Sequence, residues 1–199
     1  MTETFTAFDG QRHLASGDLA TVAAAVKRAE LGAADPIAIF SDLTGRAIDL
    51  DLRGSTEEVV TRLAAATAAH RPEEMSTRTG PRGRGRPKLG VVAREVTLLP
   101  RHWDWLNTQP GGASVALRKL IDEARRANGD ADRQRIARDA AYHFMSAIAG
   151  NLQNFEEAAR ALFAGDRRRL ADQIANWPPD IRDHIVKLAY GDRGEQLVS

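Results

Sequence analysis

The chain has 199 residues, of which 43% are hydrophobic and none is cysteine. It is therefore long enough to bury a core, while disulfides and thiolate metal ligands are excluded. The first ten residues, MTETFTAFDG, resemble no secretory signal, and no apolar run approaches the ~20 residues of a membrane helix. We therefore expect a cytoplasmic protein with no membrane partner.

The net charge of +1 conceals an uneven distribution. Residues 1–70 contain six Lys/Arg and ten Asp/Glu, residues 71–101 contain eight and three, and residues 102–199 contain fourteen of each. The positive charge is thus concentrated in about thirty residues, and such a local stripe matters more for binding phosphates than the total does.

Residues 1–70 predict a small α+β module. An alternating strand precedes Asp9-Gly10, a strong hairpin turn, and Asp18 is the expected N-cap of the following helix. A second hairpin turns at Thr44-Gly45, and Ser55 with Glu58 forms a capping box for the next helix.

Residues 71–90 are rich in Gly, Pro, Arg and Thr and nearly free of aliphatic side chains. Such a composition cannot bury a core and predicts a flexible linker. After it, residues 91–128 predict a strand (VVAREVTLL), a short helix from Pro100 to Leu106, a break at Pro110-Gly111-Gly112, and a helix from Ser114.

The apolar residues of 129–199 recur at helical spacing, which predicts an all-α C-terminal domain. We expect Asn154 with Glu157 and then Asp166 to cap two helices, Gly165 to close the first of them, and Trp177-Pro178-Pro179 to precede the last helix. The predicted fold class is α+β, with four segments: 1–70, 71–90, 91–128 and 129–199.

The basic segment contains the run Gly83-Arg84-Gly85-Arg86-Pro87-Lys88, which resembles the AT-hook of high-mobility-group chromatin proteins. The resemblance implies an extended Arg-Gly-Arg strip in the minor groove of A·T-rich DNA, where negative potential is concentrated. Arg82 and Lys88 would add phosphate contacts that make binding sensitive to salt.

The next segment, REVTLLPRHWDWLNTQPGGASVALRKLIDEARR, resembles the ribbon-helix-helix repressors, the MetJ and Arc superfamily. That resemblance implies a homodimer whose paired strands enter the major groove. Val96 and Leu98 would face the core, while Ala93, Glu95 and Thr97 would face the bases. Gly112, Ala113 and Ser114 would hold a phosphate at the start of the second helix.

The DNA-binding residues that we predict are Arg82, Arg84, Gly85, Arg86, Pro87, Lys88, Arg94, Glu95, Thr97, Arg101, Gly112 and Ser114.

Other features carry less chemistry. His102, His143 and His184 stand singly, without metal-ligand spacing, so we predict no metal or cofactor. No GxSxG, P-loop or Rossmann glycine pattern is present, and we expect no enzyme. From the linker onward, the chain also resembles the uncharacterised bacterial families of unknown function.

The sequence therefore predicts a DNA-binding homodimer, either a transcriptional regulator or a nucleoid-associated protein, that prefers A·T-rich duplexes. The alternative is a protein-interaction module or adaptor whose basic linker contacts RNA or an acidic partner. Glu95 favours this alternative because a carboxylate in the groove would be repelled by phosphates.

Overall fold

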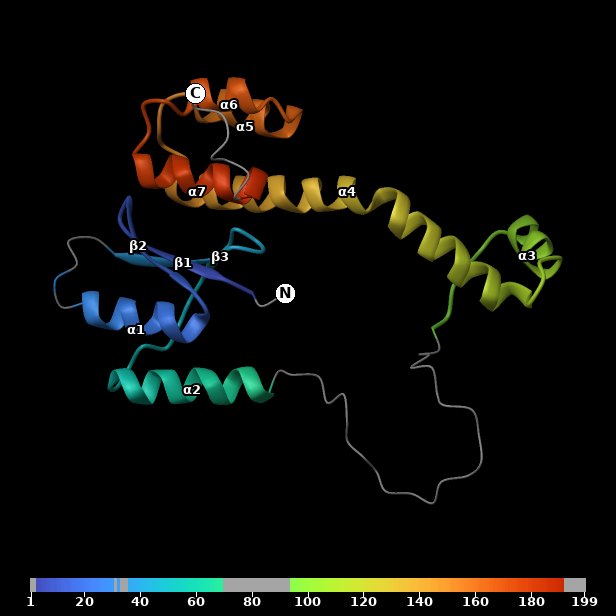
Figure 1. Cartoon of the computed structure of the whole chain (residues 1–199), viewed down its shortest axis with the longest axis horizontal. Coiled ribbons are helices and arrows are strands. Elements are labelled where there is room, and N and C mark those ends of the chain that lie inside the picture. Colours follow the sequence, from blue (N-terminus) through green and yellow to red (C-terminus); the bar gives the residue numbers. More distant parts are fainter. Residues whose placement is uncertain (1–2, 31, 33–35, 70–93, 192–199) are drawn as a thin grey trace, which may run out of the picture. The chain divides into compact units, whose positions relative to one another are not determined.

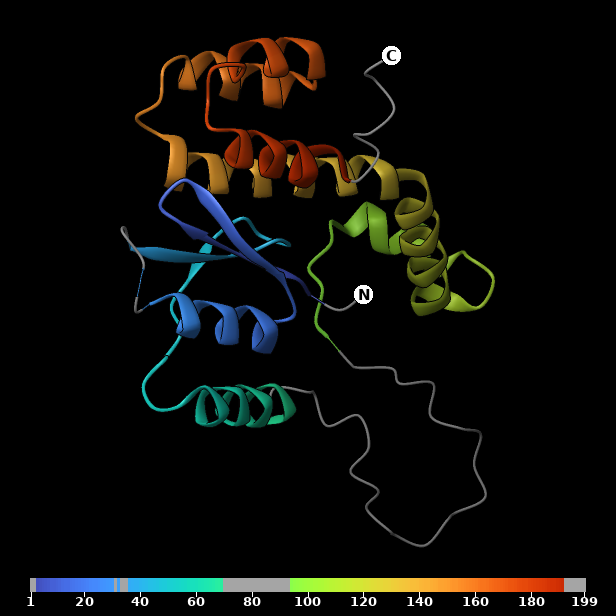
Figure 2. The same cartoon turned by 60° about the vertical axis from the view of Figure 1, so that its left-hand side comes forward.

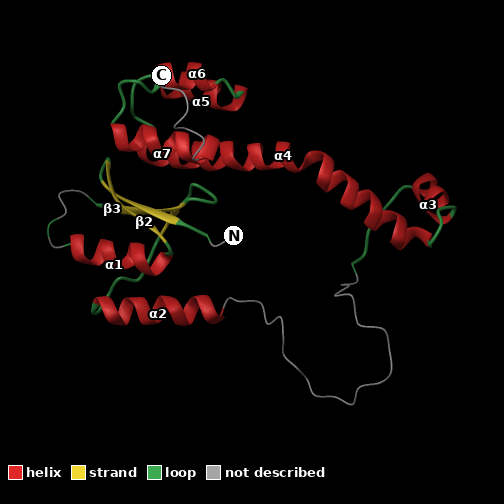
Figure 3. Cartoon of the chain, viewed as in Figure 1, coloured by secondary structure: helices red, strands yellow, loops and turns green. Residues whose placement is uncertain are grey.

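The computed structural model describes residues 3–30, 32, 36–69 and 94–191. It confirms the α+β class, because a small antiparallel sheet is combined with helices (Figure 3). The chain forms two compact units. Unit 1 joins Met1–Arg71 with Ala131–Ser199, and unit 2 is Pro72–Asp130. The sequence predicts an N-terminal module separate from the C-terminal helices, whereas the structure places both in unit 1.

The sheet is antiparallel throughout, in the order β2-β1-β3-β4. Asp9-Gly10 forms the predicted hairpin turn, with Gly10 at a positive φ of 57°. The strands are β1 (Phe5–Asp9), β2 (Arg12–Gly17), β3 (Ile37–Ser41) and β4 (Ala47–Ile48).

The predicted helix caps near the N-terminus are present. The Asp18 side chain accepts the Thr21 N–H at 2.9 Å. Ser55 and Glu58 exchange side chain-to-backbone hydrogen bonds of 2.8 and 3.2 Å, as a capping box requires. The helices are α1 (Leu19–Ala29), α2 (Thr56–Ala69), α3 (Pro100–Asn107), α4 (Gly112–Ala149), α5 (Phe155–Ala164), α6 (Arg167–Gln173) and α7 (Pro179–Tyr190).

Unit 1 is layered around the sheet. Helix α1 covers one face with α2 beyond it, and α7 with the C-terminal part of α4 covers the other face, with α5 and α6 beyond them (Figures 1 and 2). Side chains alternate between the two faces of a strand. Ala7 accordingly packs with Val22 and Val26 of α1, while Phe8 packs on the opposite side.

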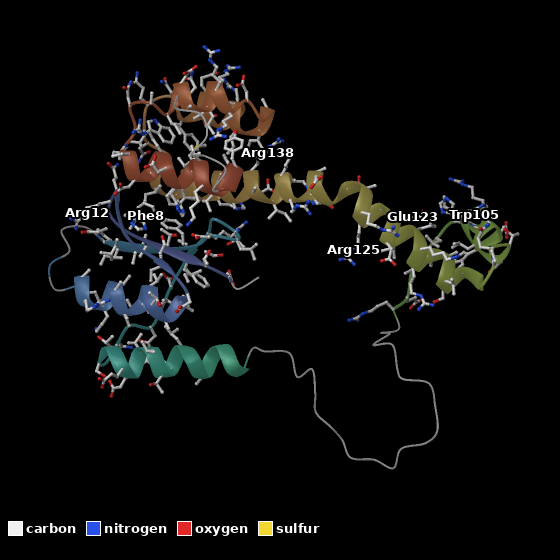
Figure 4. All side chains as sticks on the ribbon, viewed as in Figure 1. Phe8, Arg12, Trp105, Glu123, Arg125 and Arg138 are labelled. Atoms are coloured by element: carbon white, nitrogen blue, oxygen red, sulfur yellow. The ribbon has the colours of Figure 1, made fainter. Side chains whose placement is uncertain are left out.

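An aromatic cluster joins the sheet to the C-terminal helices. The Phe8 ring lies 5.2 Å from the Phe144 ring between centroids, and Phe40 lies 4.9 Å from Phe144. All three side chains are buried, and Phe8 projects from the sheet toward α4 and α7 (Figure 4). This shared core is the physical reason that the two ends of the chain form one unit.

The turn between β3 and β4 fixes the sheet against α4. His143 Nδ1 donates to the Thr44 carbonyl at 3.0 Å, and Arg46 donates to His143 Nε2 at 3.2 Å. Gly45 has a φ of 66°, and a Cβ atom at this position would clash with the Ala140 carbonyl oxygen. Glycine is therefore required here both by conformation and by space.

Three local predictions differ from the structure. Helix α4 continues to Ala149 instead of ending near residue 128, because Asn128-Gly129 does not interrupt it. Asn154 has a left-handed backbone (φ 64°) and makes no side-chain cap, although Gly165 closes α5 and Asp166 caps α6 as predicted. Residues 94–99 form no strand.

None of the helices in the described ranges is both long enough and apolar enough to cross a membrane.

Candidate functional site

The AT-hook-like run lies outside the described residues, as does Ala93. The roles assigned there therefore stay sequence predictions. The residues concerned are Arg82, Arg84, Gly85, Arg86, Pro87 and Lys88.

The segment expected to form the ribbon is described from Arg94 onward. Arg94, Glu95 and Thr97 are exposed, as groove-facing residues would be, but Val96, which we expected in the core, is 52% exposed. Residues 94–99 have no regular secondary structure. A ribbon strand is stabilised by hydrogen bonds to a partner strand, and within the described part of this single chain residues 94–99 pair with no strand.

The two helices after this segment, and the glycine turn between them, are present. Helix α3 begins at Pro100 as predicted, with Arg101 exposed in its first turn. Gly111 and Gly112 have φ angles of 87° and 77°, and Gly112 starts α4. The Gly112 N–H donates to the Gln109 carbonyl at 3.0 Å. The amides of Ala113 and Ser114 are therefore the better candidates for holding a phosphate.

The described part of unit 2 leaves most of its large apolar side chains exposed. Six of the nine exposed large hydrophobic residues in the described ranges belong to it, although it is the smaller unit. Trp105 on α3 is 51% exposed and Ile121 on α4 is 55% exposed (Figure 4 labels Trp105). Concentrated apolar exposure commonly marks an interaction surface. The six residues are Val96, Leu99, Trp103, Trp105, Leu120 and Ile121.

Charge in the described part of unit 2 is nearly balanced. Residues 94–130 contain six Lys/Arg and five Asp/Glu, and both signs occur on α4, as at Glu123 and Arg125 (Figure 4). The positive excess of unit 2 therefore comes from residues 78–88. Contacts of α3 and α4 with a polyanion would depend on individual arginines rather than on a uniformly basic face.

A polar cluster that the sequence does not predict lies in unit 1, centred on Asp42. This carboxylate follows β3 and is largely buried. Its Oδ1 accepts from Thr6 Oγ1 at 2.8 Å, and its Oδ2 accepts from Thr4 Oγ1 at 2.9 Å and from Lys187 Nζ at 3.3 Å. Hydrogen bonds to the ionised form offset the cost of burying a charge.

His184 of α7 completes this cluster from the helical side. It is 5% exposed, its ring contacts those of Phe8 and Phe144, and its Nε2 lies 3.6 Å from Asp42 Oδ1. Burial lowers the pKa of His184 to about 4, against the opposing charge of Asp42. The imidazole is therefore neutral at physiological pH.

The network continues to the surface through β2. Thr6 Oγ1 lies 3.0 Å from Ser16 Oγ, which in turn lies 2.8 Å from His13 Nε2. These side chains come from β1, β2, β3 and α7, so no single local pattern could have revealed them. The only sequence signal was a set of polar residues beside strand ends. Among the described residues, no three His, Asp or Glu side chains are grouped as a metal site requires.

A family model described as "Uncharacterized protein conserved in bacteria (DUF2239)" matches residues 4–189. No curated protein and no solved structure matches the chain. The resemblances to ribbon-helix-helix repressors and to AT-hooks gain no support from the family match and stay predictions. Because the match includes the sheet, both units and all but the end of α7, the chain belongs to this bacterial family, as its sequence had suggested.

Proposed function

We propose that the chain is a DNA-binding protein that acts as a homodimer, as a transcriptional regulator or a nucleoid-associated protein, and that it prefers A·T-rich duplexes. The observation that carries the proposal is the Arg84-Gly85-Arg86-Pro87 run in the basic segment of unit 2. The proposal assigns binding, not catalysis, to the chain.

The chemistry of this run suits a minor groove. Glycine between two arginines allows the backbone to approach the groove floor, and the guanidinium groups are attracted to the negative potential of narrow A·T tracts. Arg94 and Arg101 are exposed just beyond the run. Because they follow the run closely in sequence, we expect them to add phosphate contacts beside the groove contacts.

The exposed apolar residues of unit 2 support the dimer. Among its described residues only Leu106 and Ala116 are buried hydrophobic side chains. Burying apolar surface yields roughly 25 cal/mol per Å², and a second copy of unit 2 would supply a surface for the side chains of α3 and α4. A symmetric dimer would also present two basic segments to one duplex, which raises avidity.

The second candidate function is a protein-interaction module. The exposure of Trp103 and Trp105 favours it, because tryptophan is enriched where proteins bind each other. Exposed Glu95 also fits a protein partner better than a DNA groove.

The test is binding of the full chain to A·T-rich DNA, G·C-rich DNA and duplex RNA over a salt series. Replacing Arg84 and Arg86 with Ala should weaken binding to A·T-rich DNA by ~1–3 kcal/mol and make the salt dependence shallower. The matched control replaces two exposed arginines of unit 1, Arg28 and Arg168, with Ala and should leave affinity nearly unchanged.

Equal affinity of the wild type and the Arg84/Arg86 variant for every duplex would contradict the proposal. Equal binding of the wild type to A·T-rich DNA, G·C-rich DNA and duplex RNA would favour the interaction module instead, because its basic linker has no preference for a DNA groove.

A further inference from the structure

Helix α4 has an uncovered stretch in unit 2. Every residue from 118 to 128 is exposed, so no described part of the chain packs over this stretch. It includes two large apolar side chains, Leu120 and Ile121, which are 42% and 55% exposed. A helix that leaves an apolar face in contact with water commonly buries that face against another element or another chain. The uncovered stretch of α4 is therefore a candidate interface.

The apolar residues of this stretch fall on one face of the helix. They recur at intervals of three and four residues, which is the spacing with which one helix packs along another. With a rotation of about 100° per residue, all of them lie within about 60° of Ala124 around the helix axis. We call this face the α4 stripe, and Asn128 is its one polar member. The stripe consists of Leu117, Leu120, Ile121, Ala124, Ala127 and Asn128.

The charges beside the α4 stripe are separated by sign. Arg118 and Arg125 lie on one flank, because they are seven residues, or about two helical turns, apart. Glu123 and Asp130 have the same spacing and lie on the opposite flank. Figure 4 labels Glu123 and Arg125, the neighbours of Ala124 in the sequence. One flank of the stripe is therefore basic and the other acidic. The other charged residues between 118 and 128 lie on the back of the helix: Lys119, Asp122 and Arg126.

This separation of charge determines how two copies of α4 can pair. In a parallel pair with two-fold symmetry, the left flank of each helix meets the right flank of the other, so an acidic flank meets a basic flank on both sides. In an antiparallel pair each flank meets its own copy, which would bring Arg125 near Arg125 and Glu123 near Glu123. Like charges repel by about as much as opposite charges attract. The charges therefore favour the parallel pair.

We propose that two copies of the chain pair in parallel through the α4 stripe. This inference rests on the proposed homodimer, and it adds the surface and the orientation of that dimer. Ile121 of each copy packs against the partner's Leu120, and Ala124 at the centre of the stripe allows the two helices to approach closely. Arg125 of each copy faces the partner's Glu123, so the same ion pair forms on both sides of the seam.

A parallel pair also suits the proposed contact with DNA. Helix α3 is joined to the N-terminal end of α4 by only four residues, 108–111. In a parallel pair both copies of α3 are therefore connected to the same end, and the basic segment precedes α3 in each chain. In an antiparallel pair they would be connected to opposite ends. Two basic segments that start from one end can reach one duplex together, which raises avidity.

Because the chain contains no cysteine, disulfide cross-linking of the full chain tests the pairing directly. Leu117→Cys and Ala124→Cys place single thiols on the midline of the stripe, about 10 Å apart along the helix axis. A disulfide requires Cβ atoms about 4 Å apart. A parallel pair brings each position next to its own copy, so both variants should form covalent dimers under mild oxidation. An antiparallel pair does so at one level only. Arg126→Cys, on the back of the helix, is the control and should not cross-link.

A reversal of charge tests the orientation without cysteine. Arg125→Glu should weaken association about fivefold, because two exposed ion pairs with the partner's Glu123 are lost. Adding Glu123→Arg to this variant restores opposite charges across the seam and should recover most of the affinity. Arg126→Glu is the matched control on the back of the same helix and should associate like the wild type. Sedimentation equilibrium measures association, and circular dichroism verifies that each variant keeps its helices.

The parallel pairing is overturned, while the homodimer stands, if a dimeric chain cross-links at only one of the two stripe cysteines or at neither. It is equally overturned if Arg126→Cys cross-links as readily as they do, or if the double charge variant recovers no affinity. A wild type that is monomeric at micromolar concentration overturns both the pairing and the proposed homodimer. Binding of the wild type to DNA is measured separately, so failure of the DNA proposal is distinguishable from failure of the pairing.

Discussion

The two units of this molecule differ in whether their apolar side chains are buried or exposed. Within the described ranges, unit 1 contains 24 of the 26 buried hydrophobic residues, whereas unit 2 contains two of them and most of the exposed large ones. Unit 1 obtains its core by combining distant segments, such as Phe8 and Phe40 with Phe144. The described part of unit 2 consists of residues 94–99, the eight-residue helix α3, the turn after it and the first half of α4, and these elements bury few apolar side chains among themselves.

The difference suggests a division of roles. A unit that buries its own apolar side chains can act as a stable scaffold. A unit that leaves such side chains exposed can bury them against a partner. Our account therefore places binding to macromolecules in unit 2 and structural stability in unit 1. The predictions below probe each side of this comparison.

The largest expected effect is a loss of folding stability in unit 1 when Gly45 is replaced. Replacement with Ala should lower the free energy of unfolding by about 3 kcal/mol, because the left-handed backbone disfavours a side chain and the Cβ would clash with the Ala140 carbonyl. Urea denaturation measures the loss. The control is Gly165→Ala, which has a similar φ of 71° but meets only the end of the Arg138 side chain, and it should cost about 1 kcal/mol. Equal losses would show that the turn is not packed against α4 as described.

The second effect is the loss of stability of unit 1 in acid. The native pKa of His184, about 4, lies below its ordinary value of 6.5. Protons therefore bind the unfolded chain first, and stability should fall as pH decreases from 6.5 toward 4, by about 3 kcal/mol in total. Burial is the main cause. Lys187 and His13 also disfavour protonation, and Asp42 opposes them.

Urea midpoints at several pH values measure this loss. The variant His184→Phe keeps an aromatic ring beside Phe8 and Phe144 but cannot titrate, so its profile between pH 6.5 and 4 should be flatter than that of the wild type. Parallel profiles would contradict the assignment of the acid sensitivity to His184.

The smallest expected effect is on association through unit 2. Ile121→Glu should weaken the proposed dimer by about 1–2 kcal/mol, since a half-exposed isoleucine would lose its burial at the interface. Leu43→Glu is the matched control, because Leu43 is 59% exposed in unit 1, and it should leave association unchanged. Sedimentation equilibrium measures both. A wild-type monomer at micromolar concentration, or equal weakening by the two variants, would contradict the dimer.

Local elements of the fold were predictable from the sequence because local chemistry determines them. The Asp9-Gly10 hairpin, the Asp18 cap and the Ser55–Glu58 capping box each depend on a few adjacent residues. The arrangement of unit 1 was not predictable in this way. Phe8 and Phe144 have ordinary strand and helix spacing, and nothing in that spacing indicates that they pack together. The continuity of α4 through Gly129 was also missed, because a single glycine weakens a helix by only about 1 kcal/mol.

The candidate sites also differ in whether adjacent residues or distant residues form them. The Arg-Gly-Arg-Pro run is a local motif, so the sequence alone suggests its chemistry. The polar cluster around Asp42 instead combines side chains of β1, β2 and α7 that are far apart in the sequence, so no local motif predicts it. His13, Asp42 and His184 each looked like isolated polar residues until the fold brought them together.

The central claim is that DNA is bound by unit 2 and not by unit 1. Hydrogen–deuterium exchange of the full chain, with and without an A·T-rich duplex, tests it most directly. Our account predicts that the duplex slows exchange in peptides covering residues 82–88 and 94–118, and leaves β1, β2 and α5 to α7 unchanged. Protection confined to unit 1, or no change anywhere under conditions where the duplex is bound, would contradict it.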